Sequence, residues 1–314
     1  MPATTPFISY AQNREDVVLA RALADVERGR YVEVGANHPQ DDSVTYAFYE
    51  RGWSGLTFEP VPDFARLQRD QRPRDTLVEA AVASVPGEIT LHVVPGTGLS
   101  SVVDAVIERH DGAGLTHEDV VVPAVRLEDA LTDAGWTPEE DIHFLLVDVE
   151  GAEEDVLASV DLTRWRPWVL VIESTAPNST ESTHEAWEPA LLAAGYVFCL
   201  FDGLSRFYVA SERADVLAPR LSYPACVLDE YLPHRVNLLL QERQELRLQT
   251  AHWRTVALTA WADAVAQAPD PRSDSSAEAE RVREELRAIQ TTLSWRVTRP
   301  LRGVRRVLDK ARGR

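Results

Sequence analysis

The chain has 314 residues, of which 45% are hydrophobic, enough for one α/β domain with its own core and an extension. Its formal charge of −18 disfavours a body that binds nucleic acid, and its only two cysteines, Cys199 and Cys226, exclude a disulfide framework and a cysteine-based zinc site. Lys310 is the single lysine, which excludes Schiff-base chemistry and a phosphate-binding P-loop lysine from the body of the protein.

Short apolar runs alternate with helix-like stretches between Tyr31 and Val209, which predicts a parallel sheet with helices on both faces. Strands are predicted at Tyr31–Val34, Leu56–Glu59, Leu77–Ala83, Phe144–Val147 and Val169–Glu173, and helices at Val44–Arg51, Asp63–Arg69, Leu127–Ala134 and Ala152–Val160. The segment Thr97–Asp119 is rich in glycine and serine, and it reads as a lid or substrate loop rather than sheet, or as a solvated excursion. Asp202-Gly203 separates the runs Tyr196–Phe201 and Arg206–Val209, and predicts a hairpin that makes the last strand antiparallel.

The tight turn after the first predicted strand is a candidate binding site. Gly35 would let a ligand approach the backbone, but residues 35–40 lack the second and third glycines of a dinucleotide fingerprint, which disfavours a pyrophosphate. Glu59 ends the second strand, where an acid can accept both hydroxyls of a ribose, or it is only a solvated strand end. Together Glu33 and Glu59 favour a cationic ligand without phosphates, and S-adenosylmethionine, a sulfonium, fits that description.

Two later strands also end in acidic residues. Asp148 and Glu150 follow the strand at 144–147, and Glu173 ends the strand at 169–173. Asp148 could instead be a helix cap and Glu150 a favourable charge in the first helical turn, while His184 is either a catalytic base or a surface histidine. Because the carboxyl ends of parallel strands share one edge of a sheet, we expect these acids to lie in one site.

The C-terminal part of the chain has a different composition. Residues 229–266 read as a helix with Leu232, Val236, Leu239, Leu240 and Leu246 on its apolar face. A run of Pro, Ser and Asp over residues 268–276 predicts a linker. We therefore expect four segments, namely a globular domain over residues 1–228, a helical extension over 229–267, the linker over 268–276, and an amphipathic helix with a basic tail over 277–314.

The tail at residues 293–314 carries a net charge of +7, which leaves −25 on the rest of the chain. Its apolar residues recur at helical spacing, at Leu293, Val297, Leu301, Val304 and Leu308. This pattern predicts peripheral contact with a membrane or another anionic partner, and the alternative is docking on the acidic body. No apolar run approaches the ~20 residues that cross a bilayer, and the N-terminus lacks a signal-peptide pattern, so we expect a cytoplasmic protein. Peripheral attachment at the inner face of the membrane, through the tail, is compatible with this expectation.

From residue 9 to residue 209, the chain resembles the FkbM-type family of S-adenosylmethionine-dependent methyltransferases. The motifs that carry the resemblance are Val32–Asn37, Phe58–Pro62, Pro95–Ser100, Asp148–Glu153, Glu173–Ser179, Thr183–Glu188 and Phe201–Gly203. The resemblance implies a class I methyltransferase fold over residues 1–228, a Rossmann-like α/β sheet of seven strands with the last one antiparallel. One departure is Leu146, where the family often has a lysine.

The resemblance also implies roles for particular residues. It places Glu33, Gly35 and Asn37 around the methionine portion of S-adenosylmethionine and Glu59 on its ribose. It places Ala81 near the adenine and Asp148 beside the transferred methyl group.

Methyl transfer to a hydroxyl needs a base, because a neutral hydroxyl is a weak nucleophile. The candidate catalytic residues are Asp148, Glu173 and His184. In a metal-assisted alternative, Mg²⁺ on Asp148, Glu173 and a neighbouring amide would acidify the hydroxyl directly. We do not favour this alternative, and we predict no metal site.

The family acts on hydroxyls of glycans and specialised metabolites, and Ser294–Arg302 resembles tails of bacterial enzymes that build surface polysaccharides. We therefore expect an O-methyltransferase that acts on a sugar hydroxyl of a surface glycan or its lipid-linked precursor. The alternatives are an O-methyltransferase of a specialised metabolite, and a non-catalytic binding or scaffold protein that retains the fold. A nicotinamide oxidoreductase would need the glycines that residues 35–40 lack.

Overall fold

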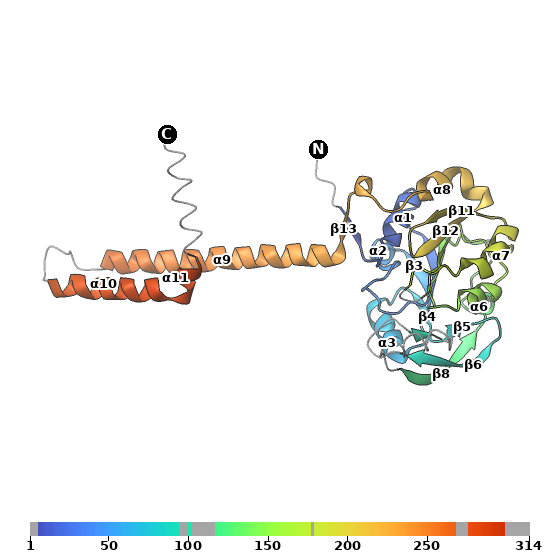
Figure 1. Cartoon of the computed structure of the whole chain (residues 1–314), viewed down its shortest axis with the longest axis horizontal. Coiled ribbons are helices and arrows are strands. Elements are labelled where there is room, and N and C mark those ends of the chain that lie inside the picture. The colour runs from blue at the N-terminus through green and yellow to red at the C-terminus, as the bar shows by residue number, and fades with distance from the viewer. Residues whose placement is uncertain (1–5, 94–99, 102–116, 177–178, 268–275, 299–314) are drawn as a thin grey trace. The chain divides into compact units, whose positions relative to one another are not determined.

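The computed structural model describes residues 6–93, 100–101, 117–176, 179–267 and 276–298. The chain divides into two compact units, residues 1–241 and residues 242–314 (Figure 1). The first unit contains the sheets and every candidate site residue. The second contains most of α9 (His234–Gln267), together with α10 (Ser276–Thr291) and α11 (Leu293–Val297).

A seven-stranded sheet forms the centre of the first unit, in the order β11-β12-β10-β9-β2-β3-β4. Its strands are β2 (Arg30–Val34), β3 (Ser54–Phe58), β4 (Thr76–Val78), β9 (Phe144–Val147), β10 (Val169–Glu173), β11 (Tyr196–Phe201) and β12 (Ser205–Ala210). The last strand, β12, pairs antiparallel with both β10 and β11, as the hairpin pattern predicts. The chain order reverses between β2 and β9, and in open α/β sheets ligands bind at this switch point.

Both faces of this sheet are buried, because its central strands are apolar at consecutive positions. One face packs against α1 (Glu15–Ala22), α2 (Tyr46–Glu50) and α8 (Ala214–Leu221), and the other against α5 (Leu127–Asp133), α6 (Glu153–Ala158) and α7 (Glu188–Ala193) (Figure 1). Neighbouring residues of β9 divide between the two cores: Phe144 and Leu146 lie in the first, Leu145 and Val147 in the second. The predicted helices are confirmed within a few residues, including α3 (Pro62–Gln71).

A smaller sheet was not predicted. It has the order β5-β8-β6-β7, with β5 (Ala81–Val82), β6 (Gly87–Val93), β7 (Ser100–Ser101) and β8 (Glu118–Val125). The prediction of one strand at Leu77–Ala83 is wrong, because β4 ends at Val78 and β5 joins the smaller sheet. The predicted loop Thr97–Asp119 is also wrong at its ends, since β7 and the start of β8 pair with β6, while residues 102–116 lie outside the described part. In β8, Val122 and Ala124 are buried and Val121 is exposed, the alternation of a strand with one buried face.

The helical extension starts later than predicted. Residues 231–233 form β13 (Tyr231–Pro233), which pairs in parallel with β1 (Phe7–Ser9), so Leu232 lies in a strand and α9 begins at His234. Pro233 disfavours the helical conformation of the residue before it, which explains why Leu232 lies in a strand. Ser276, predicted as the end of the linker, already belongs to α10, while residues 268–275 lie outside the described part.

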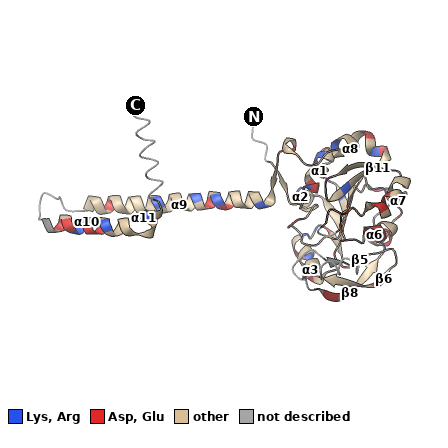
Figure 2. Ribbon diagram, in the orientation of Figure 1, with Lys and Arg blue, Asp and Glu red and all other residues tan. Residues whose placement is uncertain are grey.

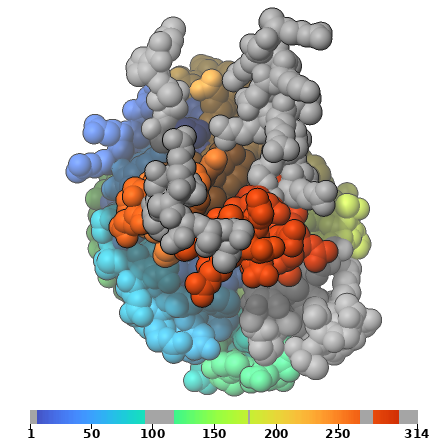
Figure 3. Space-filling view, turned by 90° about the vertical axis from the view of Figure 1, so that its left-hand side faces the viewer, coloured from blue at the N-terminus to red at the C-terminus, as the bar shows by residue number. Residues whose placement is uncertain are grey.

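The helices of the second unit have no buried side chain among the residues whose burial is described. Acidic and basic residues are interspersed along α9 and α10 (Figure 2), and the atoms of α10 lie at the surface in the space-filling view (Figure 3). Among the described residues, no helix combines the length and hydropathy that a bilayer crossing requires.

Candidate active site

The turn after β2 brings the backbone of this strand against that of β9. Gly35 has a φ of +90°, and a Cβ atom built on it would lie 1.8 Å from the carbonyl oxygen of Asp148. The Gly35 and Ala36 amides donate to the carbonyl of Phe58, at 3.2 and 3.0 Å. Only glycine fits this position, because the close approach and the left-handed backbone both exclude a side chain.

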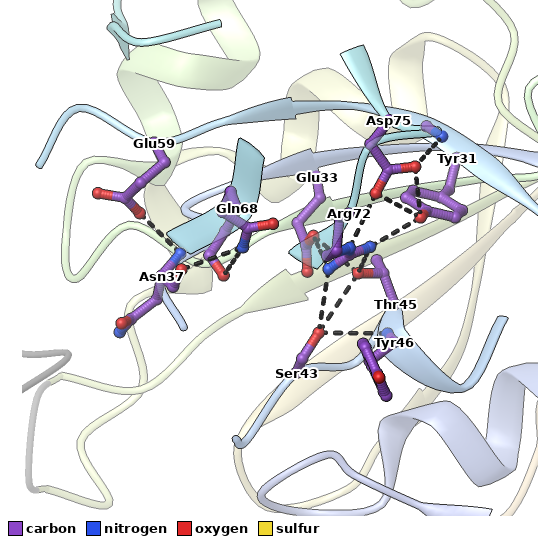
Figure 4. Close-up of polar contacts among 12 residues, drawn as sticks. Tyr31, Glu33, Asn37, Ser43, Thr45, Tyr46, Glu59, Gln68, Arg72 and Asp75 are labelled. Atoms are coloured by element: carbon purple, nitrogen blue, oxygen red, sulfur yellow. Dashed lines mark hydrogen bonds and ion pairs between the residues drawn. The ribbon is translucent and has the colours of Figure 1, made fainter. Parts of the chain in front are cut away.

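Glu59 holds the far side of the turn. One of its carboxylate oxygens accepts a hydrogen bond from the backbone amide of Asn37 at 2.6 Å (Figure 4), and the other accepts one from the backbone amide of Val61 at 2.7 Å. Asn37 has a left-handed backbone, with a φ of +46°, and the Gln68 side-chain amide donates to the carbonyls of Ala36 and Asn37. Burial raises the pKa of Glu59 to about 7, against the effect of the two amides. Each carboxylate oxygen keeps a second acceptor position for a ligand.

Glu33 belongs to a buried polar network that sequence reasoning missed. Arg72, only 1% exposed, approaches Glu33 at 3.5 Å and Asp75 at 2.8 Å, and it donates to the Tyr31 hydroxyl and to Thr45 at 2.7 Å (Figure 4). Thr45 also donates to Glu33 at 2.7 Å. Burial raises the pKa of Glu33 to about 7, while the Arg72 charge opposes the shift. The network fixes the strand that leads into the glycine turn.

All six residues predicted to contact the cofactor line one cavity of about 520 Å³. They are Glu33, Gly35, Asn37, Glu59, Ala81 and Asp148. Phe64, Val82 and Leu91 add apolar walls to the same cavity. This volume lies within the range of small-molecule sites, and its acidic rim without a three-glycine loop suits an organic cation rather than a pyrophosphate.

Asp148 and Glu173 form a carboxyl pair at the ends of β9 and β10. Their side chains share a hydrogen bond, and Glu150 approaches them closely enough that one oxygen of each of the three lies within 4.8 Å of the others. Burial raises the pKa of all three, and for Glu173 the negative charge of Asp148 raises it further. Glu150 and Gly151 have φ values of +52° and +101°, so a left-handed turn sets the position of the Glu150 side chain. Two adjacent carboxyls of this kind hold one proton between them at neutral pH.

The structure does not place His184 at the cavity lining. Its ring contacts the hydroxyl of Ser182 and lies 3.7 Å from a carboxylate oxygen of Glu188, which in turn accepts hydrogen bonds from Arg206 and Tyr208. His184 therefore belongs to a polar cluster near α7, whereas Asp148 and Glu173 lie together.

Glu15, which was not predicted as a site residue, is another buried acid on this side of the sheet. It is 3% exposed, and its carboxylate accepts a hydrogen bond from the Asn13 amide. Burial raises its pKa to about 8, with further contributions from the charges of Asp202 and Asp148. The only sequence signal was its place in the segment 9–16, where the family resemblance begins.

We expect the free energy of unfolding to fall as the pH rises from about 4.5 to about 8. Over this range Glu15 ionises in the unfolded chain, at its ordinary pKa of 4.5, but keeps its proton in the fold. Folding thus takes up a proton, and each pH unit costs at most about 1.4 kcal/mol for this group. Melting temperatures between pH 5 and pH 8 measure the effect, and Glu15→Gln should reduce the slope. An unchanged slope in that variant would assign the dependence to other acids.

The sheet order, with its antiparallel last strand, and the glycine turn are those of the class I methyltransferase fold. Residues 33–198, just over half of the chain, match the family model described as the methyltransferase FkbM domain. The chain therefore belongs to the FkbM methyltransferase family. No curated protein matches it.

Solved structures with a similar fold include the CurJ carbon methyltransferase, at 9% identity and a TM-score of 0.33, over 59% of this chain and 49% of that one. Another is the 1,6-didemethyltoxoflavin-N1-methyltransferase of Burkholderia thailandensis, which contains S-adenosylhomocysteine. It is 13% identical, with a TM-score of 0.31, over 62% of this chain and 76% of that one. The chain thus spans about half the length of the first of these proteins.

Proposed function

We propose that the protein is an O-methyltransferase in which Asp148, paired with Glu173, takes the proton of an acceptor hydroxyl. The observation that carries this proposal is the contact of the Asp148 carboxyl, at the cavity wall, with the buried carboxyl of Glu173, with which it shares a hydrogen bond. Glu173 keeps the proton of the pair, because burial, the charge of Asp148 and their shared hydrogen bond all raise the pKa of Glu173, whereas the same hydrogen bond lowers the pKa of Asp148. Asp148 is then the ionised member and can accept a proton.

S-adenosylmethionine supplies an electrophilic methyl group when it is bound in the cavity. In our proposal Glu33, Gly35 and Asn37 surround its methionine portion, Glu59 accepts the ribose hydroxyls and Ala81 lies near the adenine. Asp148 receives the hydroxyl proton as the oxygen–carbon bond forms, and the hydrogen bond from Glu173 stabilises the Asp148 carboxylate before the transfer.

We infer that the acceptor is a sugar hydroxyl of a surface glycan or its lipid-linked precursor. Several acids lie close enough to raise one another's pKa: Asp202 and Asp148 raise that of Glu15, and Asp148 raises that of Glu150 and of Glu173. This concentration of negative charge suits an uncharged, hydroxyl-rich acceptor better than an anionic one. Mass spectrometry of products from lipid-linked oligosaccharides, free glycans and hydroxylated metabolites tests this inference. Transfer to nitrogen or carbon acceptors alone would contradict O-methylation, and selective transfer to metabolites would favour a role in specialised metabolism. Cofactor binding without turnover on any acceptor would favour a scaffold.

Replacing Glu59 by alanine is expected to weaken the binding of S-adenosylmethionine about ten- to a hundredfold, or by roughly 1.5–3 kcal/mol. The change removes the proposed ribose acceptor and the support of the Asn37 and Val61 amides. Titration calorimetry measures the affinity. Glu59→Gln, which keeps one carbonyl acceptor, should lose less, and equal affinity in wild type and Glu59→Ala would contradict the assignment.

We also propose that the C-terminal tail attaches the protein peripherally to an anionic membrane surface. In its described part, Leu293 and Val297 are exposed, and α11 also carries Trp295 and Arg296; residues 299–314 lie outside the described part. Each basic residue near an anionic leaflet contributes about 1 kcal/mol. We expect co-sedimentation with anionic but not neutral vesicles, and its loss when residues 293–314 are removed. Equal recovery with both vesicle types would favour docking of the tail on the body.

A further inference from the structure

Three carboxylates from two adjacent strand ends converge near the proposed acceptor site. Asp148 and Glu150 follow β9, and Glu173 ends β10, its parallel neighbour in the sheet. One oxygen from each residue lies within 4.8 Å of the other two, a spacing at which a single ion can contact all three. Neighbouring parallel strands hold these positions, so the arrangement does not depend on a long surface loop.

A second observation concerns the unused oxygen of Glu173. The side chain is only 6% exposed, and its Oε2 atom accepts no hydrogen bond from the described residues. Glu59 is buried to a similar extent, but both of its oxygens accept backbone amides. A buried carboxylate oxygen without a partner costs about 1–3 kcal/mol or more, so a ligand at this position would stabilise the fold.

The described side chains provide no positive charge for the pair. Neither Asp148 nor Glu173 forms an ion pair with a described arginine or histidine, whereas Glu33 has Arg72. Leu146, two residues before Asp148, is apolar and lies in the core. The charge at this edge of the sheet is therefore suited to an external cation.

We propose that Asp148, Glu150 and Glu173 bind one divalent cation of the Mg²⁺ or Mn²⁺ class, which in turn holds the acceptor hydroxyl. Three carboxylate oxygens are the ligands that such hard cations prefer, and the remaining positions of an octahedral shell are left for water and the acceptor. This inference rests on the proposed O-methylation, and it revises the expectation from the sequence that the chain has no metal site. Binding of the cation displaces the proton that Asp148 and Glu173 share in the metal-free protein.

In the transfer step the hydroxyl oxygen bonds to the methyl carbon, the carbon–sulfur bond breaks and its electron pair stays on sulfur. The hydroxyl proton passes to the second oxygen of Asp148 or to water, and the cation lowers the pKa of the hydroxyl that it holds. Asp148 thus serves both as a ligand through one oxygen and as a proton acceptor through the other.

Binding of Mn²⁺ to the full chain, measured by electron paramagnetic resonance after removal of bound metal with EDTA, tests the proposal without activity. We expect about one ion per chain, and a loss of affinity of about ten- to a hundredfold in Glu150→Gln and in Glu173→Gln. Glu154→Gln, which removes an exposed acid of α6, is the matched control and should bind as wild type does. If Glu173→Gln does not fold, Glu150→Gln at its partly exposed turn still decides.

The experiment must also distinguish this site from a second cluster of side chains that could bind Mn²⁺. His92, His117 and Asp119 also lie within reach of one ion, so Asp119→Asn shows whether Mn²⁺ binds there. Unchanged affinity in both Glu150→Gln and Glu173→Gln, or loss only in Asp119→Asn, would overturn the proposal. Methyl transfer to a hydroxyl at full rate in EDTA, with no Mn²⁺ binding, would overturn the cation site but leave the O-methyltransferase standing. Mn²⁺ binding at the three acids with methyl transfer only to nitrogen or carbon would support the cation site but overturn the proposed O-methylation.

Discussion

Replacing Arg72 by methionine is expected to lower the free energy of unfolding by about 3–5 kcal/mol. The variant keeps the volume of the side chain but leaves the carboxylates of Glu33 and Asp75 in the interior without their cation. The hydroxyls of Tyr31 and Thr45 lose a hydrogen-bond donor in the same change. Urea or thermal unfolding measures the loss, and binding of S-adenosylmethionine should weaken as well, because Glu33 lies on the strand that leads into Gly35.

Arg69→Met is the matched control for this variant. Arg69 lies in the last turn of α3, the turn directly before the C-cap residue Arg72, but its side chain is 52% exposed in its ion pair with Glu79. Exposed pairs of this kind contribute about 0–1 kcal/mol. A loss in Arg72→Met no greater than that in Arg69→Met would mean that the buried network contributes little to stability.

Asp148→Asn is expected to lower kcat by about 10²- to 10⁴-fold, while the affinity for S-adenosylmethionine stays within a few-fold of wild type. Asparagine keeps the size of the side chain but cannot take a proton from the acceptor. Steady-state rates, with cofactor affinity measured separately by calorimetry, separate the two effects. We expect His184→Ala to lose much less, because His184 contacts Ser182 and Glu188 instead of the cavity lining.

The outcome for these two variants decides the identity of the base. If kcat falls in His184→Ala and not in Asp148→Asn, the base is the histidine and the carboxyl pair has another role. If both variants keep near-wild-type rates, Glu173 becomes the next candidate. A large loss of cofactor affinity in Asp148→Asn would instead assign this residue to binding.

The acidic residues of the candidate site could be predicted because each lies in or directly after a strand that the apolar pattern marks, although Glu173, unlike the others, does not line the cavity. Glu33, Glu59, Asp148 and Glu173 lie in or directly after such strands, and parallel pairing brings their ends to one edge. The pairing with Arg72 could not be predicted, because an arginine at the end of a polar helix is expected to be exposed until the fold places it against Glu33. This limit is general, since burial of a charged side chain depends on tertiary contacts that no local pattern contains.

The smaller sheet and the β1–β13 pair were missed for a related reason. In β8, Pro123 and the acids Glu118 and Asp119 obscure the alternation of Val122 and Ala124. The three-residue strands β1 and β13 are too short to give a pattern of their own, and only their pairing across the chain defines them.

The pairing of Phe7 with Tyr231 has a consequence for biosynthesis. The two segments lie more than two hundred residues apart in the sequence, so β1 leaves the ribosome about 10–45 s before its partner is translated. The first strand therefore stays unpaired while the rest of the first unit is synthesised. Because α9 starts directly after β13, the N-terminus is secured only when synthesis of the C-terminal helices begins.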